Sequence, residues 1–163
     1  MTNQPIVAVR QANTQDSAAI ATLVVELYTE LDLENYQQAD EEKIHRVVND
    51  LLSQQRIISF VAEDHNLPEE KDRIVALVTL HHCAAIYAGG EFGEISELYV
   101  GGDYRGQRVG QKLLDAARAY AQKNNWKRLE LGAPAGSRWD NTFSFYQNYG
   151  FAAIGPRLRL LVS

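Results

Sequence analysis

Residues 94–110, EISELYVGGDYRGQRVG, contain a strand, a glycine-rich turn and the start of a helix. Residues 94–100 carry the apolar side chains of a strand, and Gly101, Gly102 and Gly106 then punctuate a turn. Apolar residues recur at helical spacing after the turn, at Val109, Leu113, Leu114, Ala117 and Tyr120. The stretch therefore predicts a strand–turn–helix unit.

The turn has the features of a phosphate-binding site. A helix begins with backbone N–H groups that lack partners within the helix, and its dipole favours an anion there. Gly106 and Gly110 have no side chains to obstruct a close approach, while Arg105, Arg108 and Lys112 add positive charge to an acidic protein. The same residues are also compatible with an ordinary glycine-containing turn whose arginines are solvated.

The rest of the chain alternates between predicted strands and helices. Strands are predicted at residues 5–10, 57–62, 74–80 and 127–131, and loops at 63–73, 84–93 and 132–140. A first helix starts at Asn13 or Thr14 and runs to about Leu31, and a short one covers 141–148. Asp40 caps another helix, with an apolar face of Ile44, Val47, Val48, Leu51 and Leu52. From Phe151 onward we expect a pair of strands broken at Gly155–Pro156.

Length and composition favour one ordinary globular domain over residues 1–163. The chain is 45% hydrophobic and 23% charged, with a net charge of −5 and a pI near 5.4. Such a balance argues against partners such as nucleic acid or an anionic membrane. Because there is a single cysteine, Cys83, and neither a signal peptide nor a membrane span is recognisable, we expect a cytoplasmic protein.

A second motif, Phe145-Tyr146-Gln147-Asn148-Tyr149-Gly150-Phe151, lies one strand beyond the helix that follows the turn. Together the two motifs resemble the GNAT superfamily of N-acetyltransferases. The resemblance extends over essentially the whole chain, and it implies an α/β fold with a central mixed sheet flanked by helices. It also implies an enzyme that moves an acetyl group from acetyl-CoA to a primary amine, and homodimers are frequent in the family.

The resemblance also implies which residues bind CoA. The backbone of Leu98, Tyr99 and Val100 would hold the pantetheine arm. The pyrophosphate would lie on the turn formed by Arg105, Gly106, Gln107, Arg108, Val109, Gly110 and Gln111. Arg108 stands where the family most often has glycine, so its side chain turns outward or onto a phosphate. Trp139 occupies the spacing of the family's usual asparagine, and we assign the CoA contact to Asn141, two residues later.

Amine acetylation needs a base, because an alkyl amine with a pKa of about 10.4 is protonated at neutral pH. The resemblance places Glu94 and Glu97 beside the thioester, and the sequence does not choose between them. Strand alternation directs the two carboxylates to opposite faces unless a bulge intervenes. Tyr146 matches the family's general acid for the CoA thiolate, or else packs with the other aromatic residues of its helix.

Cys83 is interpreted as a small buried residue rather than a nucleophile, and the adjacent His81 and His82 point to opposite sides of a strand. We therefore expect no metal. A run of acidic residues without Lys or Arg between Arg10 and Lys43 predicts a cationic small-molecule acceptor with more than one positive group. The run comprises Glu26, Glu30, Asp32, Glu34, Asp40, Glu41 and Glu42. The alternative function is a non-catalytic module that senses acetyl-CoA.

Overall fold

The computed structural model describes residues 6–31 and 40–162, and the chain forms two compact units, Met1–Glu130 and Leu131–Ser163. The first unit follows the predicted order of elements closely. Its strands are β1 (Val7–Gln11), β2 (Ile58–Asp64), β3 (Ile74–Ala85) and β4 (Gly90–Val100), and β5 (Leu129–Leu131) lies at the junction of the units. Its helices are α1 (Ser17–Leu31), α2 (Glu41–Ser53) and α3 (Val109–Lys123).

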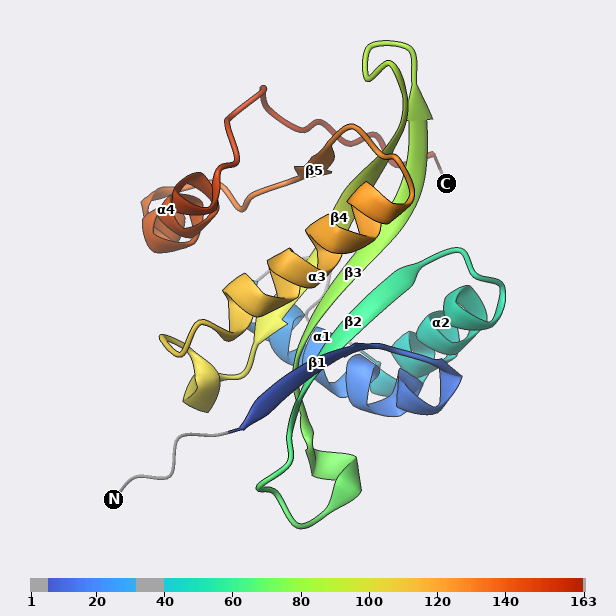
Figure 1. Cartoon of the computed structure of the whole chain (residues 1–163), viewed down its shortest axis with the longest axis vertical. Coiled ribbons are helices and arrows are strands. Elements are labelled where there is room, and N and C mark those ends of the chain that lie inside the picture. Colours follow the sequence, from blue (N-terminus) through green and yellow to red (C-terminus); the bar gives the residue numbers. More distant parts are fainter. Residues whose placement is uncertain (1–5, 32–39, 163) are drawn as a thin grey trace. The chain divides into compact units, whose positions relative to one another are not determined.

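The strands form one five-stranded sheet in the order β1-β2-β3-β4-β5, and β1 to β4 are antiparallel. The β3–β4 pair continues beyond β2, from His81 to Ala85 of β3, and forms the protruding hairpin of Figure 1. The predicted loop over 84–93 is wrong for most of its length, because both strands extend into it. A tight turn at 86–89, with positive φ at Gly89 and Gly90, is enough to reverse the chain.

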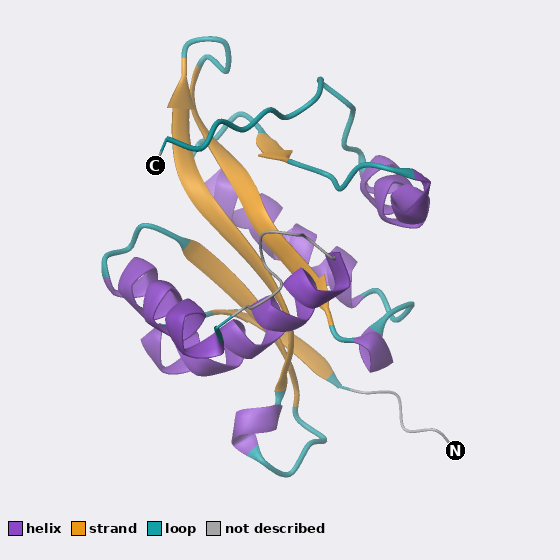
Figure 2. Ribbon diagram, turned by 180° about the vertical axis from the view of Figure 1, so that it is seen from behind, coloured by secondary structure: helices purple, strands orange, loops and turns teal. Residues whose placement is uncertain are grey.

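The two faces of the sheet are covered by different helices. Neighbouring residues of β2 show this, since Phe60 contacts Tyr120 of α3 while Val61 belongs to the core under α1 and α2. Seen from behind in Figure 2, α1 passes in front of the strands and α3 lies behind them. The predicted apolar face of α2 is confirmed at Val48, which is buried, but Val47 is 55% exposed.

A charged cluster fixes the start of α1. Asn13 caps the first turn, and the carboxylate of Asp16 accepts a hydrogen bond from the Asn13 backbone N–H at 2.8 Å. Both terminal nitrogens of Arg10 donate to Asp16 at 2.8 Å, and Arg10 also donates to Glu63 on β2. The hydrogen bond from Arg10 is the main reason that the pKa of Asp16 is lowered. The cluster thus joins β1, β2 and α1.

Asp16→Asn should lower the free energy of unfolding by about 2 kcal/mol at pH 7, less than the roughly 3–5 kcal/mol of a fully buried pair because Arg10 is partly exposed. Because the folded-state pKa of Asp16 is lowered, this stability is present above the ordinary Asp pKa and lost as pH falls through the folded value. Urea unfolding at several pH values measures it. Glu42→Gln, which removes an exposed ion pair with Arg46, is the matched control and should cost under about 0.5 kcal/mol.

The edge of β4 next to β5 is covered over only part of its length. Gly93 donates its N–H to the carbonyl of Arg128, and a Cβ at Gly93 would lie 2.5 Å from the Trp126 ring, so glycine permits this close approach. Since β5 ends at Leu131, three residues after Arg128, it does not run along Leu98–Val100. The backbone of Leu98–Val100, at the end of β4, is therefore not paired with β5 along this edge.

The second unit contains α4 (Asp140–Tyr149), within one residue of the prediction at each end. The helix ends at Gly150, whose φ of +120° suits glycine, and the N–H groups of Gly150 and Phe151 both donate to the carbonyl of Tyr146. The predicted terminal strands are wrong, because residues 151–162 form neither helix nor strand. Pro156 lacks an N–H, Gly155 has a φ of +139°, and no ladder partner is present for this segment within the described part of the unit.

Among the residues that the structure describes, no helix combines the length and the apolar character needed to cross a bilayer.

Candidate active site

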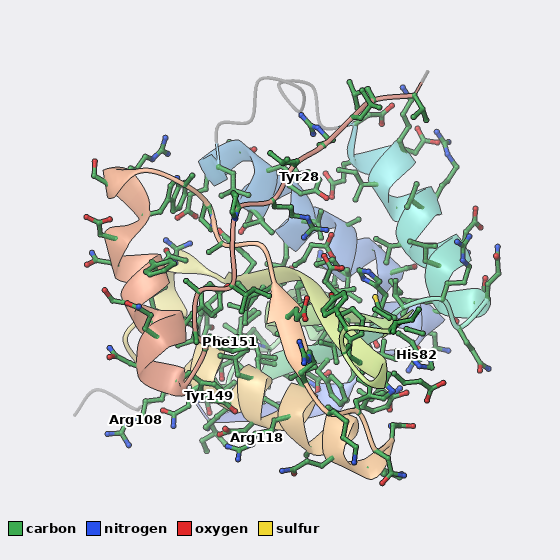
Figure 3. The ribbon with its side chains drawn as sticks, turned by 90° about the horizontal axis from the view of Figure 1, so that it is seen from above. Tyr28, His82, Arg108, Arg118, Tyr149 and Phe151 are labelled. Atoms are coloured by element: carbon green, nitrogen blue, oxygen red, sulfur yellow. The ribbon has the colours of Figure 1, made fainter. Side chains whose placement is uncertain are left out.

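The turn before α3 has the backbone conformation of a close-approach site. Gly106 and Arg108 have φ values of +73° and +62°, in the left-handed region. Arg108 is the N-cap of α3, yet its side chain makes no capping hydrogen bond, and Figure 3 shows it extending away from the ribbon. The first N–H groups of α3, from Val109 onward, therefore face the space before the helix, which suits an anion.

The other two predicted cations of the turn are engaged elsewhere. Arg105 donates to both carboxylate oxygens of Glu30 on α1, at 2.9 and 2.6 Å, and its Nε donates to the carbonyl of Val100. Its guanidinium also lies over the Tyr99 ring, 5.4 Å from the centroid. Lys112 donates its Nζ to the carbonyl of Val7 at 3.1 Å. All three cations are exposed, but the side chains of Arg105 and Lys112 are held by these contacts.

A bulge in β4 sets the direction of the two candidate bases. Thr79 of β3 pairs with Glu97, but the next residue, Leu80, pairs with Ile95, so Ser96 is an extra residue in β4. Glu94 then pairs with His81, two residues from Thr79. Because alternate residues of β3 share a face, Glu94 and Glu97 lie on the same face of the sheet. The opposite-face arrangement expected for a regular strand does not occur.

These carboxylates form an electrostatic group with His81. The Nε2 of His81 lies 3.4 Å from Glu94 Oε2, and the Ser96 hydroxyl donates to Glu97 at 2.7 Å. Burial raises the pKa of the Glu97 carboxyl, against smaller lowering effects of the Ser96 hydrogen bond and the His81 charge. Thr79, opposite Glu97, is buried. A half-buried carboxyl of raised pKa is therefore held beside a histidine–glutamate pair.

His82 faces the other side of the hairpin, as predicted from alternation. It stacks on Trp126 with the ring centroids 5.1 Å apart, and its Nε2 is 3.4 Å from a carboxylate oxygen of Glu91. Cys83 shares the face of His81 and is half-buried rather than buried. The two histidines therefore belong to different environments.

In the second unit, Tyr146 is the buried residue of α4, with 9% of its surface exposed. Its ring packs edge-on against Phe151 at 5.7 Å and beside Phe145 at 5.3 Å, and Tyr149 also contacts Phe151 (Figure 3). Burial raises the pKa of the Tyr146 hydroxyl to about 12. Asn141 is exposed in the first turn of the same helix.

The sequence from residue 55 to 153 matches the model of the acetyltransferase (GNAT) domain family. The chain belongs to the GNAT acetyltransferases. The predicted fold class is confirmed by solved structures that share the fold at low sequence identity. One is a predicted acetyltransferase from Clostridium acetobutylicum with acetyl-CoA, 19% identical over 96% of this chain and 97% of that chain, with a TM-score of 0.74.

Two further structural neighbours of this GNAT protein have named acceptors. An aminoglycoside acetyltransferase from an uncultured soil metagenomic sample, in complex with sisomicin, is 18% identical over 96% of this chain and 95% of that chain, with a TM-score of 0.71. A ribosomal-protein-alanine N-acetyltransferase from Brucella melitensis biovar Abortus 2308 is 18% identical over 95% and 98%, with a TM-score of 0.69. No curated protein sequence matches the chain at a significant level.

The acidic run of this GNAT protein does not form a free acidic wall in the part of the chain that the structure describes. Its members have local partners: Glu26 interacts with Tyr99, Glu30 with Arg105, Glu41 with Thr22 and Glu42 with Arg46, and Asp40 caps α2. Asp32 and Glu34 lie outside the described residues. Because these carboxylates already have local partners, we interpret the run as a solvated helix surface and not as a wall that attracts a polycation.

Arg108→Gly tests which part of the turn holds the anion. A non-glycine residue in the left-handed region costs about 1–2 kcal/mol, so glycine should raise the free energy of unfolding by about 0.5–1 kcal/mol, after its larger unfolded-state entropy is subtracted. If the backbone N–H groups bind the phosphate, CoA affinity should fall less than about fivefold, the scale of an exposed charge. Calorimetry measures the affinity, with Arg118→Ala, an exposed charge later in α3, as the control. A fall above about thirtyfold would instead make the guanidinium a direct phosphate ligand.

Proposed function

We propose that this GNAT protein transfers the acetyl group of acetyl-CoA to a primary amine of a small molecule. The observation that carries the proposal is the bulge at Ser96, which directs Glu94 and Glu97 to one face of the strand that leads into the phosphate-type turn. Base and cosubstrate site are thus parts of one continuous segment, residues 94–110. That arrangement suits direct transfer between two bound substrates.

The segment has backbone groups that suit two parts of CoA, the pantetheine arm and the pyrophosphate. The backbone of Leu98, Tyr99 and Val100 lies on the part of β4 that β5 does not cover, and its polar groups suit the amides of a pantetheine arm. The residues from Arg105 to Gln111 present the first N–H groups of α3 to the pyrophosphate. Acetyl-CoA supplies the activated thioester. The chain binds it, orients it and moves the protons.

Glu97 is the proposed base. It takes the proton of the acceptor ammonium, directly or through a water, so that the neutral amine attacks the thioester carbonyl. Its raised pKa suits that task, because a carboxylate of ordinary pKa is a weak proton acceptor at neutral pH. Glu94, paired with His81, holds negative charge on the same face and attracts the cationic acceptor.

Tyr146 is the proposed acid. When the tetrahedral intermediate collapses, the C–S bond breaks and the CoA thiolate takes the phenolic proton, which prevents the reverse attack. A pKa of about 12 keeps the phenol protonated at neutral pH, so the donor form is fully populated. Asn141 is proposed as a further polar contact to CoA from the first turn of α4.

An assay of CoA release with a thiol reagent, across a panel of small amines, tests the proposal. The panel contains aminoglycosides, polyamines and amino acids, and the N-terminal peptide of a ribosomal protein is included because one structural neighbour acts on ribosomal-protein alanine. Release that depends on a small amine supports the proposal. Calorimetric binding of acetyl-CoA without release for any amine would support the sensor, and preference for the peptide would contradict a small-molecule acceptor.

A further inference from the structure

We propose that His81, Cys83 and Glu94 form a binding site for Zn²⁺ on the β3–β4 hairpin. His81 and Cys83 alternate on β3 and therefore share a face, and Glu94 is the cross-strand partner of His81. One ligand atom from each residue, a histidine nitrogen, the Cys83 sulfur and a carboxylate oxygen, can be chosen so that all three lie within 4.8 Å of one another. The sequence-based expectation of no metal considered His81 with His82, whereas the register joins His81 to Cys83 and Glu94.

The distances suit a tetrahedral ion. Zn²⁺ binds nitrogen, sulfur and oxygen ligands at about 2.0–2.3 Å, which places neighbouring ligand atoms roughly 3.3–3.7 Å apart. His81 Nε2 and Glu94 Oε2 are already 3.4 Å apart, and the Cys83 sulfur lies within 4.8 Å of a ligand atom of each of them. Tetrahedral spacing therefore requires the sulfur to move closer by a shift on the order of 1–2 Å. A side-chain rotation of Cys83, whose sulfur lies 3.9 Å from the His81 carbonyl oxygen, would bring it toward the other two ligand atoms.

The kind of ligands selects the class of metal. A thiolate with an imidazole and a carboxylate suits Zn²⁺ and related transition metals, whereas Mg²⁺ and Ca²⁺ prefer oxygen ligands alone. Binding releases the thiol proton as the S–Zn bond forms. Three protein ligands leave the fourth position to water, and all three residues are half-buried, so the ion can enter from solvent.

Zinc at this site would also block acetyl transfer, an effect that rests on the proposed function. The ion would occupy the Glu94 carboxylate and place positive charge on the face that carries Glu97. An ammonium acceptor would then be repelled from its base. The hairpin would thus carry an inhibitory metal site.

Titration of the metal-free protein with Zn²⁺ and with Co²⁺ tests the site without any enzyme assay. We expect one ion per chain, a thiolate-to-metal charge-transfer band with Co²⁺, and an affinity lowered at least about 100-fold by Cys83→Ser or Glu94→Gln. The matched control, His82→Gln, changes the neighbouring histidine on the opposite face and should keep the affinity. Absence of stoichiometric binding, or equal affinity in Cys83→Ser, would overturn the site.

Turnover with and without Zn²⁺ tests the blocking role. Each variant is compared with its own metal-free rate, and we expect at least tenfold inhibition of the wild type and less than twofold inhibition of Cys83→Ser. Tight binding with unchanged wild-type turnover would overturn the blocking role. A chain that binds Zn²⁺ but acetylates no amine would contradict the proposed function while keeping the metal site.

Discussion

Glu97→Gln should lower kcat/KM for the amine by about 10²-fold or more, the usual scale for the loss of a positioned base. Glutamine keeps the size of the side chain and its place opposite Thr79, but it cannot accept a proton from the ammonium. Steady-state kinetics at saturating acetyl-CoA, in buffer with a chelator, measure the loss. Because the substitution leaves the turn before α3 untouched, the affinity for CoA should change little.

The pH profile separates a base from a structural residue. A base works deprotonated, so the raised pKa of Glu97 moves the acid limb of kcat/KM above the ordinary Glu value of about 4.3, and the limb should vanish in the glutamine variant. The titratable groups beside it are His81 and Glu94, and Glu94→Gln should keep the limb. Glu91→Gln, on the other face of β4, is the matched control. Full activity in Glu97→Gln with a large loss in Glu94→Gln would exchange the two roles.

Local patterns predicted the phosphate-type turn correctly as a strand–turn–helix unit. Apolar spacing and glycine placement act within a few residues, and α3 (Val109–Lys123) contains every apolar position of the predicted helix. The pairing of Arg105 with Glu30 involves residues 75 positions apart, and no local pattern carries that information. The Arg105 side chain, expected at a phosphate, therefore pairs with a carboxylate of α1 instead.

The direction of Glu94 depends on strand register, which the sequence leaves open. A bulge adds one residue to one strand of a pair, and it reverses the face of every later side chain. The amino-acid sequence around Ser96 does not mark the bulge, because the bulge is defined by the pairing of β4 with Thr79 and Leu80 of the neighbouring strand. The His81–Glu94 pair was missed for the same reason.

The end of the chain shows the opposite failure, in which a local pattern predicts structure that does not form. Apolar and charged residues alternate around Leu158 and Leu160, and both side chains are largely exposed, at 91% and 84%. A strand is stabilised by the hydrogen bonds of a partner strand rather than by its own alternation. The local sequence was therefore insufficient to predict a strand.

Tyr146→Phe should lower kcat by roughly 10²-fold or more, with little effect on CoA affinity. The substitution removes only the phenolic oxygen, so the ring contacts with Phe145 and Phe151 are kept. Loss of thiolate protonation slows the collapse of the tetrahedral intermediate, and kinetics with calorimetry of CoA binding measure the two effects separately.

A purely structural role for Tyr146 makes a different prediction. If the residue acts by packing its helix, Tyr146→Phe should leave turnover and stability almost unchanged, and Tyr146→Ala should lower both together by removing a buried ring. A general acid instead loses turnover in the phenylalanine variant while the thermal midpoint stays within a few degrees. The matched control is Tyr149→Phe, which should keep full turnover. Tyr149 lies about one helical turn after Tyr146 on α4 and is half-buried. Equal losses in Tyr146→Phe and Tyr149→Phe would refute the assignment of the acid to Tyr146.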